Sequence, residues 1–472
     1  MVWFPGWFLL ACSLAPHAAP AGPNVLLITV DTLRADHLGV YGYERDTSPT
    51  VDALADGGVR FSRAYSPRGA TWPALTTLMT SWYPSEHGVR ENATASTDAP
   101  TTLAEALHTH GYQSAAILTN ADNAHWEGFD VIRPVHQEPL DANAASEAEK
   151  WLASPHADPW LLWVHLSSPH DPYVDHPEVR SFLDPGYSGP ISDAQGPLVR
   201  AMFPAPSAAP AGRAPPAPLT GQSADLDAIV ARYDSEVANA DVAIGRILTA
   251  LRVQQLEAST LVIVSADHGE ELAEHPPYLF HFMSPWDAVL RVPLIASQPG
   301  RLPKGKVVEG AVGLIDVAPT VLEWLSLPVP TAWHGGSLAP LLTGASRGDR
   351  PVYSELSLEA LIVHAGRWAM IANPRGYAGE LAPPMQVLEA GLTAELSAQN
   401  RWPIPQRALF DVTVDPRQQH DVQAANPAVV KQLEAGFAAF RKATGWPGAS
   451  TAPASPEVRE QLERLGYTSG DL

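Results

Sequence analysis

The chain has 472 residues, which is enough for one large domain and one smaller one. Hydrophobic residues make up 45% of it and charged residues 17%, a balance typical of a globular protein rather than a disordered one. The formal net charge of −21 argues against nucleic acid or an anionic lipid surface as a partner. An anionic substrate would therefore need local positive charge, most simply from a metal ion.

The first 21 residues resemble an export leader, with a short apolar run followed by small residues. Residues 9–12, Leu-Leu-Ala-Cys, match a bacterial lipoprotein cleavage box in which Cys12 would carry the lipid. The alternative is ordinary secretion with cleavage after Ala21. Either route predicts an exported protein, periplasmic or in the cell envelope, whose only membrane contact is a possible lipid anchor at Cys12. Cys12 is the only cysteine, which excludes intramolecular disulfides and thiolate metal ligands.

Near-continuous apolar runs predict the strands of a buried parallel sheet. Three of these runs are residues 24–30, 160–164 and 261–266. Between them, apolar residues at helical spacing predict helices at residues 103–110, 147–153 and 226–253. This alternation predicts an α/β fold, with a large domain whose mostly parallel sheet is sandwiched by helices.

Composition divides the chain into further parts. We predict a catalytic domain over residues 22–335, interrupted at 203–222 by a proline- and alanine-rich insertion that forms a surface excursion or flexible lid. Shorter strand-like pieces and a helix at 427–443 then predict a smaller C-terminal α+β domain over residues 336–449. Residues 450–472 form a tail.

Polar side chains follow the three predicted strands directly: Asp31 the first, His165 the second, and Asp267 with His268 the third. Ligands of such sheets bind beyond the carboxyl ends of the strands, so one site can collect these side chains. Two carboxylates and an imidazole suit Mn²⁺, Mg²⁺, Ca²⁺ or Zn²⁺. We therefore predict that Asp31, Asp267 and His268 bind one divalent metal ion, with His165 in a supporting or structural role. The alternative is that the carboxylates complete turns at the strand ends.

Residues 71–88 read TWPALTTLMTSWYPSEHG, and Thr71 is the candidate nucleophile of this segment. A free hydroxyl is a weak nucleophile at neutral pH, but coordination to the metal ion would activate Thr71 Oγ. The alternative is that Thr71 caps a helix, since Thr-x-Pro before an apolar stretch is a reasonable helix start. The two roles are compatible, because a helix N-terminus also stabilises an anion placed against it.

The same segment resembles the signature of the sulfatase family of the alkaline phosphatase superfamily, C/S-x-P-S-R-x-x-x-L-T-G followed by Y-P-x-x-H-G. The residues that keep this spacing are Pro73, Leu78, Thr80, Tyr83, Pro84, His87 and Gly88. Thr71 takes the nucleophile position, where sulfatases have a Cys or Ser that is oxidised to formylglycine. The resemblance runs from about residue 23 to residue 422 and implies a sulfatase-like hydrolase.

Further blocks carry the resemblance along the chain. They are residues 30–37 (VDTLRADH), 165–173 (HLSSPHDPY), 267–270 (DHGE) with 291–294 (RVPL), 314–320 and 409–416. Through these blocks the resemblance supports the metal ligands already predicted. It also implies that His170 and His281 act in catalysis by contacting the substrate anion and the leaving group, whereas the alternative for both is a surface or capping histidine. His87 is expected to satisfy a turn.

Four differences from the sulfatase pattern bear on the reaction. Thr71 replaces the formylglycine precursor, so we expect no formylglycine, and Leu75 replaces the arginine that supports the aldehyde hydrate. Thr32 stands where many sulfatases have a second calcium-binding aspartate. Thr119 and Ala121 stand where a Lys-x-His pair would contact sulfate. The set of two aspartates, a threonine and a histidine instead resembles the site of lipoteichoic acid synthases and phosphoethanolamine transferases. Those enzymes attack phosphodiesters with a metal-bound threonine.

Three functions follow from these observations. The favoured one is a metal-dependent ester hydrolase or group transferase that uses Thr71, with a phosphodiester or phosphomonoester substrate. The second is a sulfuric ester hydrolase that works without formylglycine. The third is a catalytically inactive lipoprotein that binds an anionic glycan or lipid headgroup. The partner is thus a small-molecule, lipid-headgroup or glycan ester and not nucleic acid.

Overall fold

The structure is a computed structural model. It describes residues 22–92, 100–119, 126–189, 224–272, 274–275, 279–281, 284–346, 348, 350–356, 360–373 and 405–445. Four features predicted from the sequence lie outside the described residues: the leader with Cys12, Ala121, the segment 203–222 and the tail 450–472.

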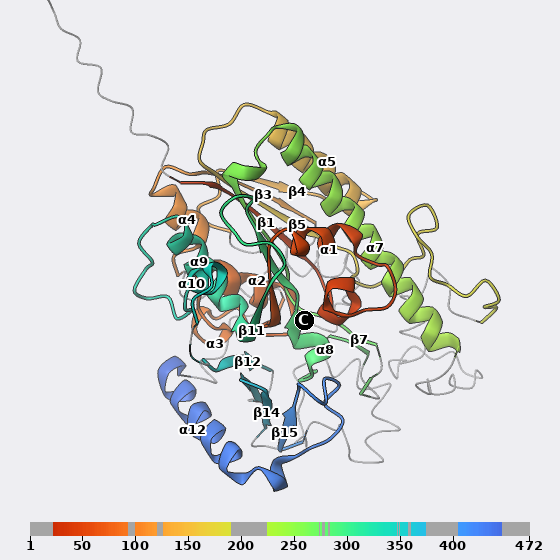
Figure 1. Cartoon of the computed structure of the whole chain (residues 1–472), viewed down its shortest axis with the longest axis vertical. Helices are drawn as coiled ribbons and strands as arrows, with labels where there is room; N and C mark the ends of the chain where they lie inside the picture. The colour runs from red at the N-terminus through yellow and green to blue at the C-terminus, as the bar shows by residue number, and fades with distance from the viewer. Residues whose placement is uncertain are drawn as a thin grey trace, which may run out of the picture.

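A nine-stranded sheet forms the centre of the molecule (Figure 1). Its strand order is β11 (Lys306–Gly313), β2 (Val59–Tyr65), β10 (Leu294–Ser297), β6 (Thr260–Ala266), β1 (Asn24–Val30), β5 (Trp160–Leu166), β3 (Gln113–Leu118) and β4 (Val131–Pro134), and β9 (Arg291–Val292) pairs with β2. The strands pair in parallel except β9 and β10, which run antiparallel to their neighbours. The predicted mostly parallel sheet is confirmed.

The three strands predicted from apolar runs are β1, β5 and β6, which are adjacent in the middle of the sheet. Every residue of these strands is buried. The reason is that helices cover both faces of the sheet, so neither face of a central strand meets water and both must be apolar.

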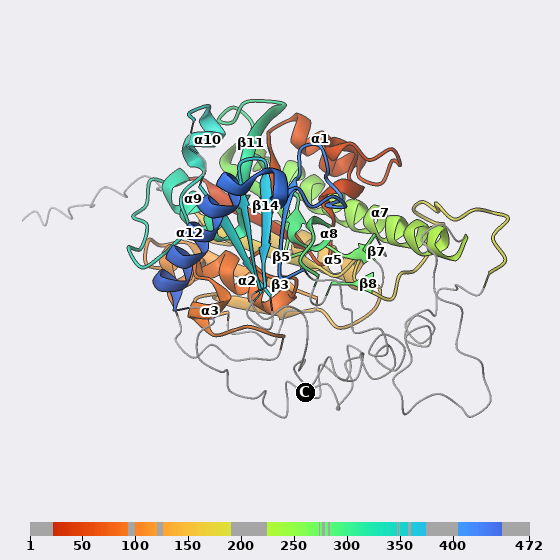
Figure 2. The ribbon, with the colours of Figure 1, turned by 90° about the horizontal axis from the view of Figure 1, so that it is seen from below.

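Helices lie on both faces of the sheet (Figures 1 and 2). One face carries α1 (Pro49–Asp56), α5 (Leu140–Ala153) and α7 (Ala224–Val253), and the other carries α2 (Thr71–Thr80), α4 (Leu103–His108), α9 (Val317–Trp324) and α10 (Ala339–Thr343). The short elements α3 (Pro84–His87), α8 (Asp287–Leu290), β7 (Glu271–Leu272) and β8 (Leu279–Phe280) belong to the connections. Helix α5 begins well before the predicted start at residue 147, because its first half buries alanines, which give only a weak apolar pattern.

A second sheet is small and antiparallel, in the order β12 (Val352–Glu355), β13 (Leu361–Ala365), β14 (Trp368–Ala372) and β15 (Arg407–Asp411). Alternate residues point to its two faces. Leu361 and Val363 pack with Phe437 of α12 (Pro427–Thr444), whereas Ile362 packs with Tyr65 and Val289 of the main body. Both faces are therefore covered, and the small sheet is fixed between α12 and the edge of the large domain (Figure 1).

A buried histidine on the small sheet packs against the main body. The ring of His364 on β13 stacks on Tyr65 at the end of β2, with ring centroids 3.5 Å apart and planes 15° from parallel. His364 Nδ1 lies 3.9 Å from Asp287 Oδ1. Neither ring nitrogen has a hydrogen-bond partner among the described residues, although the side chain is only 1% exposed. Burial, with a smaller contribution from the charge on Arg63, lowers the pKa of His364 from 6.5 to about 3.

We expect His364→Phe to reduce the acid sensitivity of folding. Because the pKa of His364 is about 3 in the folded protein, the unfolded chain takes up a proton that the folded chain does not. The stability linked to this residue is complete above its ordinary pKa and is lost as the pH falls, by about 1.4 kcal/mol per pH unit. Urea unfolding of both proteins between about pH 7 and pH 5 measures this difference. Free energies of unfolding that change in parallel would contradict it.

Candidate active site

The carboxyl ends of β1 and β6 place two carboxylates side by side. The strands are parallel neighbours whose last residues are paired, so Asp31 and Asp267 leave the sheet at the same level. Both side chains are fully buried. Asp267 Oδ1 accepts hydrogen bonds from the backbone N–H groups of Thr32 (3.2 Å) and His268 (2.7 Å), which fix the orientation of this carboxylate.

His268 completes this group. Its Nδ1 donates to the carbonyl oxygen of Gly269 at 2.9 Å, and its Nε2 lies 3.7 Å from Asp31 Oδ1 and 3.5 Å from Asp267 Oδ2. One ligand atom from each of the three residues lies within 4.8 Å of the other two. Two atoms bound to one metal ion at about 2.1 Å each are at most about 4 Å apart, so the distances to Nε2 suit a shared ion.

The chemistry of these atoms also fits a divalent cation. Among the described residues, neither Asp267 Oδ2 nor His268 Nε2 has a hydrogen-bond partner, although both are buried. Burial raises the pKa of Asp267 to about 7 and lowers that of His268 to about 3, because each charged form is disfavoured away from water. A metal ion requires a carboxylate and a neutral imidazole, and its charge would stabilise the carboxylate. Asp31, Asp267 and His268 could therefore hold a metal ion, as the sequence predicts.

His170 and His281 lie next to this group. The ring centroid of His281 is 4.4 Å from that of His268 and 5.5 Å from that of His170. Burial disfavours charge on His170, but the carboxylates of Asp31, Asp171 and Glu270 outweigh it and raise its pKa to about 9. Burial, followed by the charge of His170, lowers the pKa of His281 to about 3. The group of potential ligands is thus flanked by one imidazole that favours the charged form and one that favours the neutral form.

Thr71 is the first residue of α2 and is 3% exposed. Ala70 takes the N-cap position, so the interpretation of Thr71 as the capping residue was wrong. Strand β2, which precedes this helix, runs in the same direction as β6, since β10 lies antiparallel between them. The loop before α2 therefore starts at the same edge of the sheet as Asp267. There it passes so close to His281 that a Cβ atom on Gly69 would lie 3.0 Å from the His281 carbonyl oxygen.

The positions that depart from the sulfatase pattern have other roles in the structure. Leu75 is fully buried in the hydrophobic core between α2 and its neighbours, where burial of an unpaired charged side chain would be unfavourable. The hydroxyl of Thr119 donates to the carbonyl oxygen of His165 at 3.1 Å. Thr32 is fully buried and adopts a left-handed backbone conformation with φ of 54°, which is unusual for a β-branched residue.

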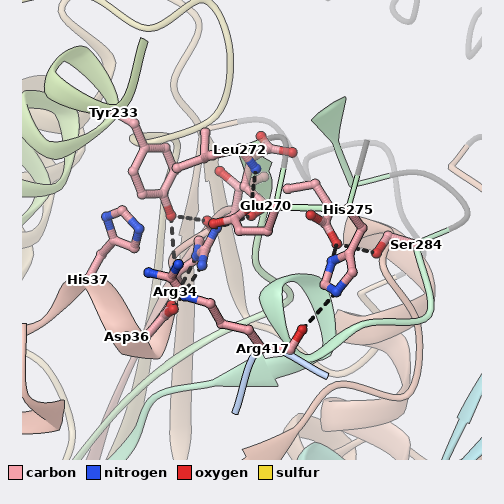
Figure 3. Close-up of polar contacts among 12 residues, drawn as sticks. Arg34, Asp36, His37, Tyr233, Glu270, Leu272, His275, Ser284 and Arg417 are labelled. Atoms are coloured by element: carbon pink, nitrogen blue, oxygen red, sulfur yellow. Dashed lines mark hydrogen bonds and ion pairs between the residues drawn. The ribbon is translucent and has the colours of Figure 1, made fainter. Parts of the chain in front are cut away.

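Sequence reasoning missed the network around Arg34 (Figure 3). The guanidinium donates to the carbonyl oxygen of Glu270 at 3.0 Å and pairs with Asp36 and Glu274. The backbone N–H of Arg34 donates to the hydroxyl of Tyr233, which donates in turn to the carbonyl oxygen of Thr32 at 2.7 Å. These contacts tie the turn after β1 to the segment after β6 and hence hold the two carboxylates together. The only signal for Arg34 was its place inside the block VDTLRADH.

Glu270 was also missed as a functional candidate. Its Oε1 lies 3.0 Å from His281 Nδ1, so this contact fixes the orientation of the His281 ring. Three other histidines have structural contacts. His165 Nδ1 bonds with the hydroxyl of Thr29, and His87 Nε2 bonds with that of Thr77. His275 bonds with Glu271 and the carbonyl oxygen of Arg417 (Figure 3).

Comparison with known proteins identifies the family. The sulfatase family model matches residues 23–327. The chain belongs to the sulfatase family. It is a sulfatase-like ester hydrolase, as expected from the signature segment.

The similarity to individual relatives is distant but extensive. An ulvan-active sulfatase of Formosa agariphila is 24% identical over 74% of this chain and 69% of its own length. A Δ4,5-hexuronate-2-O-sulfatase of Bacteroides thetaiotaomicron is 24% identical over 71% of this chain and 75% of its own. Among solved structures, a 2-O GAG sulfatase has a TM-score of 0.68 at 19% identity, covering 93% of this chain and 96% of its own. A phosphonate monoester hydrolase of Agrobacterium radiobacter has a TM-score of 0.63 at 21% identity, with 89% and 96% covered.

We expect Asp267→Asn to abolish tight binding of a divalent cation. Asparagine keeps Oδ1 for the two backbone N–H groups but replaces Oδ2, the oxygen that lies 3.5 Å from His268 Nε2. Affinity for Mn²⁺, Zn²⁺, Ca²⁺ or Mg²⁺, measured by titration calorimetry, should fall by at least about 100-fold. Asp241→Asn is the matched control, because Asp241 is 3% exposed and also accepts two backbone N–H groups. Equal affinities in both variants would contradict the predicted site.

Proposed function

We propose that this protein is a metal-dependent ester hydrolase or group transferase in which Thr71 is the nucleophile and a phosphodiester or phosphomonoester is the favoured substrate. The observation that supports it is the cluster of Asp31, Asp267 and His268 at the sheet edge from which the loop to Thr71 departs. A buried cluster of this composition fits a cation, and a hydroxyl placed beside a cation is a usable nucleophile.

The reaction requires a nucleophile, charge neutralisation and proton transfer. A divalent cation bound by Asp31, Asp267 and His268 would neutralise ester oxygen charge and favour ionisation of the Thr71 hydroxyl. Thr71 Oγ forms a bond to phosphorus while the ester oxygen leaves with a proton, and water then releases Thr71 by attack on phosphorus. An alcohol in place of water gives group transfer. His170 and His281 are the imidazoles that accept and return protons and contact the anion.

Two observations favour a phosphate ester over a sulfate ester. Threonine is not a precursor of formylglycine, and Leu75 fills the core at the position of the arginine that supports the aldehyde hydrate. Phosphonate monoester hydrolases from Agrobacterium radiobacter and Silicibacter pomeroyi are among the proteins of similar structure. A phosphoryl centre attacked by a hydroxyl is therefore consistent with both the residues and the fold.

A sulfuric ester hydrolase without formylglycine is the second candidate. It is supported by the curated relatives, which include an ulvan-active sulfatase and a Δ4,5-hexuronate-2-O-sulfatase. One similar structure is a complex with D-glucosamine-2-N,6-O-disulfate, and another contains a neocarrahexaose. These names support a glycan as the organic part of the substrate for the second candidate.

We also propose that the protein is exported and acts on a small-molecule, lipid-headgroup or glycan ester in the periplasm or cell envelope. The leader pattern with Cys12 supports export and a possible lipid anchor. None of the helices that the structure describes has the length and apolar character needed to cross a membrane.

We expect Thr71→Ala and chelation of the metal each to reduce phosphate ester hydrolysis by at least about 1,000-fold, because the nucleophile and its activator act as a unit. Thr71→Ser should retain activity, since serine keeps the hydroxyl. The measurement is turnover of aryl phosphate, bis-aryl phosphate and aryl sulfate esters by the purified protein supplied with Mn²⁺, Ca²⁺, Mg²⁺ or Zn²⁺.

The outcomes separate the candidates. Activity that survives both the Ala substitution and chelation would rule out the proposed mechanism. Sulfate ester turnover that exceeds phosphate ester turnover would establish the second candidate. A protein that hydrolyses none of these esters with any of the metals would contradict both.

A further inference from the structure

The loop that carries His170, residues 167–176, follows β5 and is held by side chains from two helices. Among the described residues, the hydrogen bonds of His170 stay within this loop: its Nδ1 donates to the carbonyl oxygen of Asp171 at 2.8 Å, and its backbone N–H donates to that of Ser167 at 2.9 Å. The place of the imidazole beside His281 therefore depends on how the loop backbone is fixed. The structure shows which groups fix it: the carboxylates of Asp141 and Glu236.

Asp141 holds the start of the loop. It lies in the first turn of α5 and is 2% exposed. Its two oxygens accept the backbone N–H groups of Ser167 at 2.7 Å and Ser168 at 3.1 Å. Each oxygen receives one N–H, so an amide at this position can accept only one of the two.

Glu236 on α7 holds the loop on both sides of His170. Its Oε2 accepts the hydroxyl of Ser168 at 2.6 Å, and its Oε1 accepts the backbone N–H of Val174 at 2.9 Å. His176 Nε2 lies 3.2 Å from Oε2, and this contact raises the pKa of His176 to about 9. One carboxylate thus accepts hydrogen bonds from the loop both before and after His170.

We propose that Asp141 and Glu236 are positioning residues for His170, which hold the imidazole at the place where it meets the anionic substrate. This inference rests on the proposed function. Within the described part of the chain, both carboxylates accept hydrogen bonds from this loop and not from the metal-ligand group or Thr71, so each acts through the loop. Loss of either should disturb His170 while the cation site at Asp31, Asp267 and His268 stays intact.

Asp241 provides a matched control for general stability. It lies on α7 like Glu236, is 3% exposed, and accepts two backbone N–H groups, those of Thr50 and Val51, at 2.9 Å each. Burial raises its pKa to about 6, as it does for Asp141. The difference is that Asp241 holds the start of α1, which carries none of the candidate site residues.

The test compares Asp141→Asn, Glu236→Ala and Asp241→Asn for kcat and KM on bis-aryl phosphate, for Mn²⁺ affinity and for melting temperature. The first two should lower kcat/KM by about 10- to 100-fold, the range found for residues that orient others at metal sites, with Mn²⁺ affinity within about twofold of the original. Asp241→Asn should lower the melting temperature similarly and leave kcat/KM within about twofold. Glu236→Gln, which can still accept from Val174, should recover part of the loss.

A double-mutant cycle decides whether the effect passes through His170. In a His170→Ala background, Glu236→Ala should cost little further activity, because the group that it positions is already gone. Losses of kcat/KM that multiply in the double variant would overturn the inference while leaving the proposed function in place. The same holds if the losses in Asp141→Asn and Glu236→Ala are no larger than the loss in Asp241→Asn. The same cycle can be measured without turnover by comparing the affinity of the four proteins for inorganic phosphate. A starting protein that neither hydrolyses esters nor binds phosphate would overturn the proposed function, and this inference with it.

Discussion

The arrangement of the molecule depends on two carboxylates, Asp31 and Asp267, that lie side by side away from water. Removing one ionised carboxylate from water costs several kcal/mol, and a second one beside it adds repulsion. The two carboxylates lie together because the parallel strands β1 and β6 end at the same level, so that the next residue of each, Asp31 and Asp267, leaves the sheet at one place. Such a pair is stable only if protons, a cation or donor groups balance its charge, and backbone N–H groups supply only part of that balance.

The nearby positive charges are divided between structural and site roles. Arg34 pairs with Asp36 and Glu274 and supports the backbone at Glu270, so its charge is already balanced. His170 favours its charged form because nearby carboxylates outweigh the effect of burial, and its ring lies 5.5 Å from that of His281. A divalent cation would supply the remaining charge, and His268 already presents a neutral imidazole for it. The electrostatics of the site therefore agree with the metal dependence that we propose.

The family membership and the chemistry of the nucleophile are separate matters. The sheet, the flanking helices and the order of the blocks are those of a sulfatase, and they follow from burial and strand pairing. The first half of α2 carries the residues on which the proposed reaction depends. Leu75 is buried in the core, and Thr71 at the start of the helix offers a hydroxyl as the nucleophile that we propose. The family fold is thus compatible with a hydroxyl nucleophile of the kind that we propose.

The sequence by itself determined the central strands and pointed to the candidate ligand set at their ends. Residues 24–30, 160–164 and 261–266 are apolar runs long enough for strands buried on both faces, and Asp31, Asp267 and His268 follow two of them directly. His170 and His281 had no such local signal and were predicted only through the resemblance to sulfatases. The start of α5 was missed because its buried residues are alanines, whose pattern is weak.

Only the tertiary structure decided which side chains hold the site in place. Arg34 contacts Tyr233, 199 residues away, and Glu236 contacts Ser168, 68 residues away. In the sequence an acidic residue on a helix looks the same whether it faces solvent or accepts two backbone N–H groups. Asp141 and Asp241 have similar burial and similar contacts, and they differ in the segment that each holds, which is the His170 loop for Asp141 and the start of α1 for Asp241. That difference is set by the packing of α5 and α7 on the sheet, because local periodicity defines the face of a helix but not its neighbour.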